Sequence, residues 1–513
     1  MSRDFARGFF QDPLVEDAIE HISTADRVVF FCGAGVSLEQ GLPTWSSLVA
    51  QLFDKFVSSH LARGQEFTEL ALNEFHQVPT ATIVDAYMRK RLSTKDESEF
   101  QTRRAVQVQE LLYSGLAEFK SPSLVEEIMW LALVLRVAGA EVHVMTTNYD
   151  DLLEWSAATR PVIRDGFLTY GISVKSYDME PPSKHIPEGE IPVVHLHGFL
   201  PRAVPASAKS SIVLSENDYF HWEENNKCGS YISSMFASST VVMVGASLRD
   251  NNIVRFLEQT HSNRKYRRFA VIPCQEWNRL DVNDPASAIR FDLSTLSFDR
   301  GRELEVEVLQ PDFFGQVRTF LFETSMAVQA QGRRRSYSHR LRDWINGRKA
   351  ISDSLPERES ASERCLLLAT TISSRLNAFF EGVKVEVWTR QPDDRSLELW
   401  ASSRSILFPN EPGPPKRLNM SASPETSAAL AAFASQGVVT GQAHETSRWT
   451  HFVAVNNVTS SSPALERIPV GATVLLLKQR RGVDDGDARR ALTAQLSDLT
   501  DQIRALGDGI LAL

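Results

Sequence analysis

The stretch Arg27–Trp45, RVVFFCGAGVSLEQGLPTW, decides the fold of the first half of the chain. It begins with a continuous apolar run, Val28 to Cys32, of the length and composition that suit a strand buried on both faces of a parallel sheet. A Gly-Ala-Gly turn follows, and glycines at a strand-to-helix turn let the backbone approach a pyrophosphate and point N–H groups at it. The next glycine is Gly41, so the spacing departs from GxGxxG.

Apolar runs of the same kind recur along the first 325 residues. They cover residues 141–146, 191–196, 240–244 and 269–273, and an alternating run at 304–309 indicates an edge or late strand. The stretch 44–140 has mostly helical spacing and is far longer than an ordinary connection. We therefore expect residues 1–325 to form a Rossmann-like parallel sheet with a helical insert at about 45–140.

A second unit is indicated over residues 360–513. The pattern predicts a helix at 362–380, strands at 383–389 and 396–401, a helix at 425–435, strands at 451–455 and 471–478, and a last helix. We expect a linker at 326–359, where residues 333–349 hold seven Lys or Arg and one acid. Such a charge run is normally solvated, and binding of an anion or nucleic acid is the alternative. The expected fold class is therefore α/β, with a small α/β domain after the Rossmann-like sheet.

The last helix carries a row of apolar residues at heptad spacing. Its members alternate four and three residues apart: Leu492, Leu496, Leu499, Ile503, Leu506, Ile510 and Leu513. A helix packed on its own domain and a helix that pairs between subunits both fit this row. A homo-oligomer is therefore among our expectations.

Composition limits the class of protein. The 513 residues are 42% hydrophobic and 23% charged, as in an ordinary globular protein, and the net charge of −9 argues against nucleic acid as the main partner. The four cysteines form no CxxC pair and fit neither a disulfide framework nor a zinc site; they are Cys32, Cys228, Cys274 and Cys365. With no signal peptide and no run of about 18 apolar residues, we expect a cytoplasmic protein without a membrane partner.

Polar residues follow the second predicted strand, at Thr147-Asn148-Tyr149-Asp150. The carboxyl ends of parallel strands are where α/β sheets bind ligands. The Asn148 carboxamide has donors and an acceptor suited to ribose hydroxyls or a water, and Asp150 could orient its neighbours. The alternative is a polar cap on the next helix.

The third and fourth predicted strands also end in polar or glycine-containing segments. His195-Leu196-His197-Gly198 ends the third strand, and we expect only one of these histidines to face the cleft, where it would suit general base work. A structural histidine is the alternative. The fourth strand ends in Gly245-Ala246-Ser247, a second turn that offers backbone donors to a ligand.

Together the strand-end motifs resemble the core of the sirtuin family, over about residues 15–275. In chain order they are Gly33-Ala34-Gly35-Val36-Ser37 with Gly41-Leu42-Pro43, Thr147-Asn148-Tyr149-Asp150, His197-Gly198 and Gly245-Ala246-Ser247. By this resemblance Asn148 and His197 are the catalytic residues, while His195 does not match the motif position. Residues implied to bind the dinucleotide are Gly33, Ala34, Gly35 and Ser37 of the phosphate-binding loop, with Asp150, Gly245 and Ser247.

The sequence departs from the deacylase type of sirtuin. The segment 151–195 lacks the four-cysteine zinc module of that type, and Thr44-Trp45-Ser46 stands where the deacylases have Asp-Phe-Arg. The pattern is more similar to bacterial sirtuin-like effectors of anti-phage defence, including Thoeris effectors, which hydrolyse NAD. The resemblance implies that NAD+ is the substrate and that no metal or further cofactor is needed. A protein deacylase or ADP-ribosyltransferase, and a non-catalytic module that binds NAD or ADP-ribose, are the alternatives.

The second unit resembles a GAF-type sensor domain. The likeness rests on its order of helices and strands and on the string Ile468-Pro469-Val470-Gly471-Ala472. It implies that a small molecule or a phage-derived activator acts there on the first unit. Trp400 and Trp449 either line a ligand pocket or belong to the core.

Overall fold

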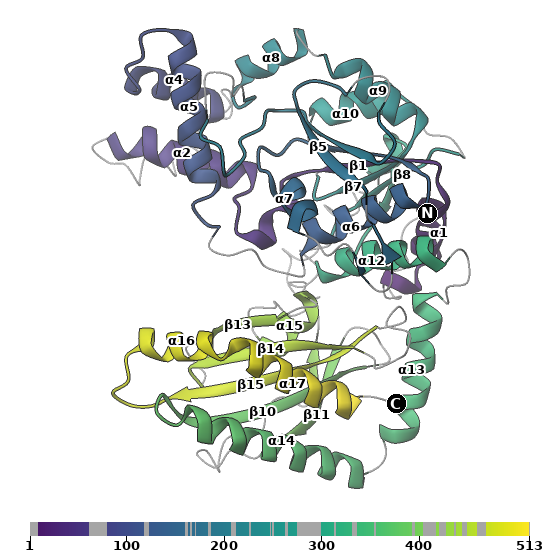
Figure 1. The fold of residues 1–513 in the computed structure, drawn as a ribbon, viewed down its shortest axis with the longest axis vertical. Helices are drawn as coiled ribbons and strands as arrows, with labels where there is room; N and C mark the ends of the chain where they lie inside the picture. The colour runs from purple at the N-terminus through teal and green to yellow at the C-terminus, as the bar shows by residue number, and fades with distance from the viewer. Residues whose placement is uncertain are drawn as a thin grey trace.

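The chain forms two stacked α/β domains in the computed structural model (Figure 1). The described residues are 9–60, 80–116, 123–159, 163–164, 167–169, 171–182, 186–206, 212–224, 227–246, 248, 251–261, 265–273, 299–311, 314–330, 336–352, 355–391, 396–403, 417–419, 427–435, 438–443, 449–458 and 468–511. Cys274 and Ser247 lie outside them. No helix among these residues is long and apolar enough to cross a membrane.

The first domain is built on a seven-stranded sheet in which every neighbouring pair is parallel. In spatial order its strands are β5 (Ser173–Asp178), β6 (Glu190–His195), β2 (Glu141–Thr146), β1 (Arg27–Cys32), β7 (Thr240–Val244), β8 (Arg268–Val271) and β9 (Glu307–Leu309). The predicted Rossmann-like sheet is confirmed, and β1 lies at its centre. A separate two-stranded ribbon pairs β3 (Ile163–Arg164) with β4 (Phe167–Leu168).

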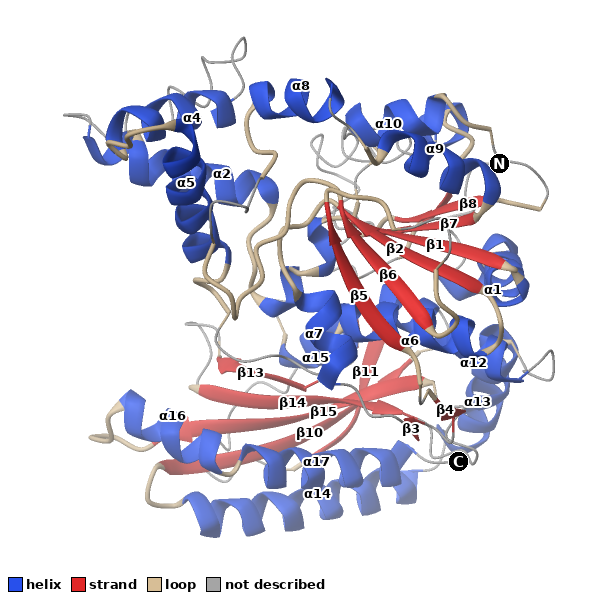
Figure 2. Cartoon of the chain, turned by 45° about the horizontal axis from the view of Figure 1, so that its top comes forward, coloured by secondary structure: helices blue, strands red, loops and turns tan. Residues whose placement is uncertain are grey.

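Helices cover both faces of this sheet (Figure 2). One face packs on α1 (Pro13–Thr24), α6 (Leu124–Val137), α7 (Leu152–Thr159) and α12 (Gly315–Ala330), and the other on α8 (Glu216–Glu224), α9 (Gly229–Ser238) and α10 (Asn251–Glu258). The β1 side chains alternate between the two cores: Val28 and Phe30 face the first, and Val29 and Phe31 the second. Burial on both faces explains why the strand is continuously apolar.

An insert lies beside the sheet, at the left of Figure 1. Its described helices include α2 (Trp45–Phe56), α4 (Thr80–Arg91) and α5 (Glu97–Leu112), and we call these the helical insert. The Thr44 side chain caps α2 by accepting a hydrogen bond from the Ser47 N–H. Helix α6 also lies in the stretch predicted as insert, but it packs under the sheet, and a capping box of Ser123 and Glu126 fixes its start. Short 3-10 turns occur at Phe9–Gln11, Ala34–Val36, Leu38–Gln40 and Ser58–His60.

The second domain contains a six-stranded antiparallel sheet. Its strands, in spatial order, are β12 (Arg417–Asn419), β11 (Ser396–Ser402), β10 (Phe380–Arg390), β15 (Pro469–Gln479), β14 (His451–Val458) and β13 (Val438–Gln442). Helix α15 (Ala428–Ser435) covers one face, while α14 (Leu355–Leu376) and α17 (Leu496–Leu511) lie side by side on the other (Figure 2). This is the small α/β domain expected from the sequence; Trp400 and Trp449 are buried in it.

The predicted last helix is two helices, α16 (Asp485–Ala494) and α17. The heptad residues Leu499, Ile503 and Ile510 are buried against the second sheet, which is the intradomain alternative for this row. Oligomer formation stays a prediction.

Helix α13 (Tyr337–Ser352) occupies much of the range predicted as linker and joins the domains. The Tyr337 ring stacks on Phe10 with ring centroids 4.0 Å apart, and its hydroxyl accepts a 2.8 Å hydrogen bond from Arg390 of β10. Arg340 forms a buried ion pair with Glu323 of α12. Part of the basic charge in this stretch is therefore used inside the protein.

Candidate active site

The glycine turns that follow β1 and β7 pack on each other through their backbones. The Gly33 N–H donates to the Val244 carbonyl at 3.0 Å, and the Gly35 N–H donates to the Gly245 carbonyl at 3.0 Å. A Cβ atom on Gly33 would lie 2.5 Å from the Gly245 oxygen, and one on Gly35 would lie 2.8 Å from the Gly245 Cα. Gly245 itself has a φ of +65°. Close approach of the two turns therefore requires these glycines, whether or not a ligand binds.

The first turn already uses most of its backbone donors. Besides the two bonds to the β7 turn, Val36 N–H donates to the Gly33 carbonyl at 3.1 Å and Ser37 N–H to the Ala34 carbonyl at 3.2 Å. A phosphate group at this turn would have to use other donors or displace these bonds. Ala34 and Gly35 are partly exposed, while Gly33 and Ser37 are buried. Phosphate binding by this loop stays a prediction.

Asn148 follows β2 and is held in a fixed orientation. Its backbone N–H donates to the Thr146 hydroxyl at 3.0 Å, and its side-chain Nδ2 donates to the Gly33 carbonyl at 3.1 Å and to Ser37 Oγ at 3.2 Å. Both N–H groups of the carboxamide are thereby used. Its Oδ1 accepts no hydrogen bond from the residues that the structure describes.

Asp150 completes this group and also caps a helix. Its carboxylate accepts the Ser37 hydroxyl at 2.9 Å and the Leu152 N–H, at the start of α7, at 3.2 Å. Burial raises the pKa of Asp150 to about 6, although these two hydrogen bonds act to lower it. The Ser37 hydroxyl is thus donated to Asp150, and Ser37 and Asp150 orient the Asn148 amide from one side.

His195, which we had set aside, supports Asn148 from the other side. Its Nδ1 lies 3.0 Å from the Asn148 carbonyl oxygen and its Nε2 lies 2.8 Å from Glu154 Oε1. Burial acts to lower the pKa of His195, but the Glu154 carboxylate, the Asn148 carbonyl and the Asp150 carboxylate together raise it above its usual value. Both ring nitrogens face acceptors, which suits an imidazolium. In the sequence, the only signal that His195 would support Asn148 was its position two residues before the motif histidine, His197.

His197 lies in different surroundings. Its ring makes edge-on contacts with Tyr219 and Trp222 of α8, with centroids 5.2 and 5.5 Å away, and it is 4% exposed. The two histidines have different neighbours, although residues two apart on a regular strand share a face, and which of them faces a cleft stays a prediction. Their surroundings differ because β6 ends at His195 and the chain turns before Gly198, which has a φ of +108°.

One residue, Val213, connects the segments that carry Asn148 and His197. Its N–H donates to the His197 carbonyl at 2.8 Å, and its carbonyl accepts the Tyr149 hydroxyl at 2.6 Å. The parallel sheet therefore places Asn148, Ser37, Asp150 and the glycine turns in one hydrogen-bonded group. His197 lies at the end of the adjoining strand, and Ser247 is outside the described residues.

One comparison with known proteins gives a match that spans part of this site. Residues 142–292 match the family model of the SIR2-like domain, a range that includes Asn148 and His197. A search of the curated proteins gives no match. One solved structure, described as "Structural Basis for the Mechanism and Regulation of Sir2 Enzymes", has a sequence 13% identical to this one. The match covers 63% of this chain and 100% of that chain. Its TM-score of 0.30 is too low to support a conclusion. The SIR2-like match supports NAD-dependent activity in general.

Proposed function

We propose that the first domain hydrolyses NAD+ at the bond between nicotinamide and ribose, releasing nicotinamide and ADP-ribose. The observation that carries the proposal is the fixed carboxamide of Asn148. Its N–H groups are held by Gly33 and Ser37, and its oxygen, which accepts no hydrogen bond from the described residues, can accept one from a ligand at the carboxyl edge of the sheet. His197 follows the adjoining strand of the same sheet, within the range that matches the SIR2-like domain.

The chemistry suits an amide and an imidazole. When the glycosidic bond breaks, its electron pair moves to the positively charged pyridinium nitrogen, so nicotinamide leaves as a neutral molecule. The ribose carbon becomes oxocarbenium-like and is attacked by water. Asn148 Oδ1 accepts a hydrogen bond from a ribose hydroxyl or from that water. His197 accepts the proton that the water loses, a general base contribution typically worth about 10²- to 10⁴-fold in rate.

The test is nicotinamide release by the purified full chain, with and without candidate activators. We expect release from the wild-type protein in at least one condition and its loss in Asn148→Ala and in His197→Ala. His143→Ala is the matched control, because His143 is a buried histidine within β2 that bonds Tyr231 and Glu141 instead of the site. Release that persists in both site variants would place the reaction elsewhere, and nicotinamide release that requires an added acyl-lysine substrate would favour a deacylase.

We also propose that the second domain controls this activity and that the protein acts as an anti-phage defence effector. An unregulated NAD+ hydrolase would harm its own cell, so a control domain has a clear purpose. The buried contacts of Tyr337 and Arg340 at the domain junction supply a route between the two units. In phage-infected bacteria, NAD+ should fall with the wild-type chain and stay constant with Asn148→Ala. Equal protection by both chains would contradict the defence proposal.

A further inference from the structure

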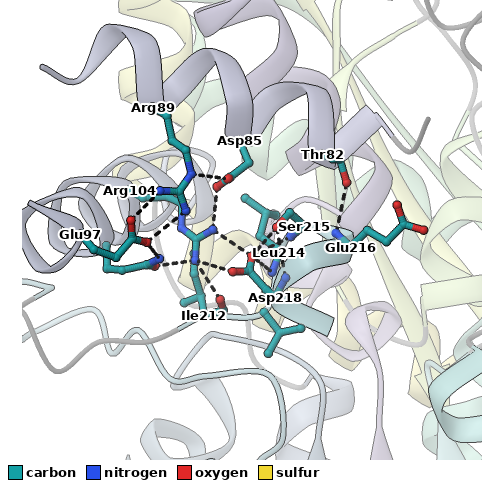
Figure 3. Close-up of polar contacts among 12 residues, drawn as sticks. Thr82, Asp85, Arg89, Glu97, Arg104, Ile212, Leu214, Ser215, Glu216 and Asp218 are labelled. Atoms are coloured by element: carbon teal, nitrogen blue, oxygen red, sulfur yellow. Dashed lines mark hydrogen bonds and ion pairs between the residues drawn. The ribbon is translucent and has the colours of Figure 1, made fainter. Parts of the chain in front are cut away.

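A buried arginine joins the helical insert to the segment that follows the third motif. Arg104 of α5 is 1% exposed, and its guanidinium makes five hydrogen bonds (Figure 3). Toward the insert it donates to Asp85 Oδ1 of α4 at 2.7 Å and to Gln101 Oε1 at 2.6 Å. Toward the sheet it donates to the Ile212 carbonyl at 3.1 Å and to both Asp218 carboxylate oxygens, at 2.8 and 3.2 Å.

The first route from Arg104 to His197 runs through the backbone. Ile212, whose carbonyl Arg104 holds, immediately precedes Val213. The Val213 N–H donates to the His197 carbonyl, and the Val213 carbonyl accepts the hydroxyl of Tyr149, the neighbour of Asn148. A shift of Ile212 therefore moves a residue that is bonded to both strand-end motifs.

The second route runs through α8. Asp218, paired with Arg104, accepts the N–H groups of Leu214 at 3.1 Å and Ser215 at 2.8 Å, and so fixes the start of this helix. The next turns of α8 carry Tyr219 and Trp222, whose rings contact the His197 imidazole. Arg104 thus holds both the backbone and the aromatic neighbours of His197.

The chemistry of the arginine makes this arrangement specific. A buried guanidinium is costly unless it is paired, and the two terminal nitrogens of Arg104 meet two carboxylates and a carbonyl at once, while its Nε has no partner among the described residues. A lysine has a single charged nitrogen on a flexible stem and cannot reproduce that geometry. Asp85 is also bonded by Arg89, at 3.1 Å, so the insert end of the network is itself held in place.

We propose that Arg104 is a positioning residue for His197, through which the helical insert sets the imidazole for its role in the reaction. The proposal rests on the proposed hydrolase function for its kinetic consequence, but the placement of His197 can be measured independently. The matched control is Arg268, a second buried arginine. It lies at the amino end of β8, whereas the motifs follow the carboxyl ends of the strands. Its guanidinium donates to the Leu257 carbonyl and to the Thr260 hydroxyl.

The experiment compares Arg104→Lys with Arg268→Lys in the full chain. Proteins labelled with ¹³C at histidine Cε1 give one ring signal per histidine, and His197→Gln identifies the signal of His197. The faces and edges of Tyr219 and Trp222 shift that signal, so it reports the ring's position. In Arg104→Lys we expect the signal to move and kcat for nicotinamide release to fall about 10- to 100-fold, with KM within about twofold, as for a misplaced catalytic group. In Arg268→Lys we expect neither change.

The outcomes separate the two proposals. An unmoved His197 signal in folded Arg104→Lys overturns the positioning role, and so does an equal shift in both variants. A shift confined to Arg104→Lys, in a protein whose wild type never releases nicotinamide, supports the positioning role and rejects the hydrolase function. If Arg104→Lys does not fold, Asp85→Asn cuts the insert side alone and leaves the pair with Asp218. It should then show the same signal change to a smaller extent, and an unchanged signal there overturns the proposal.

Discussion

Gly33→Ala should separate the two glycine turns without straining the backbone. Gly33 has φ −105° and ψ −177°, a conformation that any L-residue adopts. The added methyl group would lie 2.5 Å from the Gly245 oxygen and 2.6 Å from the Ala246 Cα, both backbone atoms. An ordinary contact is about 3.5–4.0 Å, so one turn must move by roughly 1 Å. Overpacking of this kind costs about 1–3 kcal/mol of unfolding free energy.

Two other glycines separate this steric cost from the cost of backbone conformation. Gly139 has a φ of +99° and no atom within 4 Å of an added Cβ, so Gly139→Ala should cost only about 1–2 kcal/mol for its left-handed conformation. Gly245 combines a φ of +65° with a Cβ position 2.5 Å from the Val36 nitrogen. Gly245→Ala should therefore lose unfolding free energy both from the steric overlap and from the left-handed conformation, about 2–5 kcal/mol if the two add.

The assay is calorimetric unfolding of the full chain, with each variant compared with the wild type by its transition temperature. Of the three single variants, we expect Gly245→Ala to lower the transition temperature of the first domain most. Because the Gly33 carbonyl accepts the Asn148 side chain, Gly33→Ala should also reduce nicotinamide release, while Gly139→Ala should not. A Gly33→Ala/Gly245→Ala double variant should lose less unfolding free energy than the two single variants lose together, since both methyl groups force open the same contact. An unchanged transition in Gly33→Ala, or strict additivity in the double variant, would refute this reasoning.

Two further predictions concern buried charges. Because burial raises the folded-state pKa of Asp150 from 3.8 to about 6, the folded protein binds more protons than the unfolded chain between these values, and the free energy of unfolding should fall by about 2 kcal/mol as pH rises from 4 to 6. Urea unfolding across that range should show this decline in the wild type and lose it in Asp150→Asn. At the domain junction, Glu323→Gln should remove a carboxylate that pairs with the buried Arg340 guanidinium and lower the free energy of unfolding by about 3–5 kcal/mol. Scanning calorimetry should then show the two domains unfolding further apart in temperature, and a single unshifted transition would contradict the pairing.

In the first sheet, the strands that the sequence predicts from continuous apolar runs are those buried on both faces. The central strands β1, β2, β6, β7 and β8 are continuous apolar runs, because helices cover both sides of the sheet. The edge strand β5 was missed because its side chains alternate between exposed and half-buried, and Lys175 and Asp178 interrupt the pattern. β13 was missed for the same reason, with Thr440 and Gln442 among its five residues. The prediction of a single last helix was wrong in one respect: the helix is interrupted at Gln495, between α16 and α17.

The candidate site was predictable as a set of residues but not as a set of contacts. The motifs supplied Asn148 and His197, and the parallel sheet brings the ends of their strands together. The glycines were expected to face a phosphate, whereas a large part of their requirement is the packing of one turn on the other. Arg104 could not be found from the sequence, because its partner Asp218 is 114 residues away and no local pattern marks a buried guanidinium.

The orientation of the Asn148 carboxamide explains why motifs that are ambiguous one at a time become specific together. A buried amide must satisfy both of its N–H groups, since leaving either unpaired costs about 1–3 kcal/mol. Gly33 and Ser37 satisfy them, Asp150 fixes the Ser37 hydroxyl, and His195 holds the backbone. The amide therefore cannot turn over without losing both bonds, so its oxygen points one way before any substrate arrives. An acceptor that is fixed in advance stabilises a developing positive charge more than one that must reorient. Fixing the Asn148 carboxamide in this way takes residues from three separate segments of the chain.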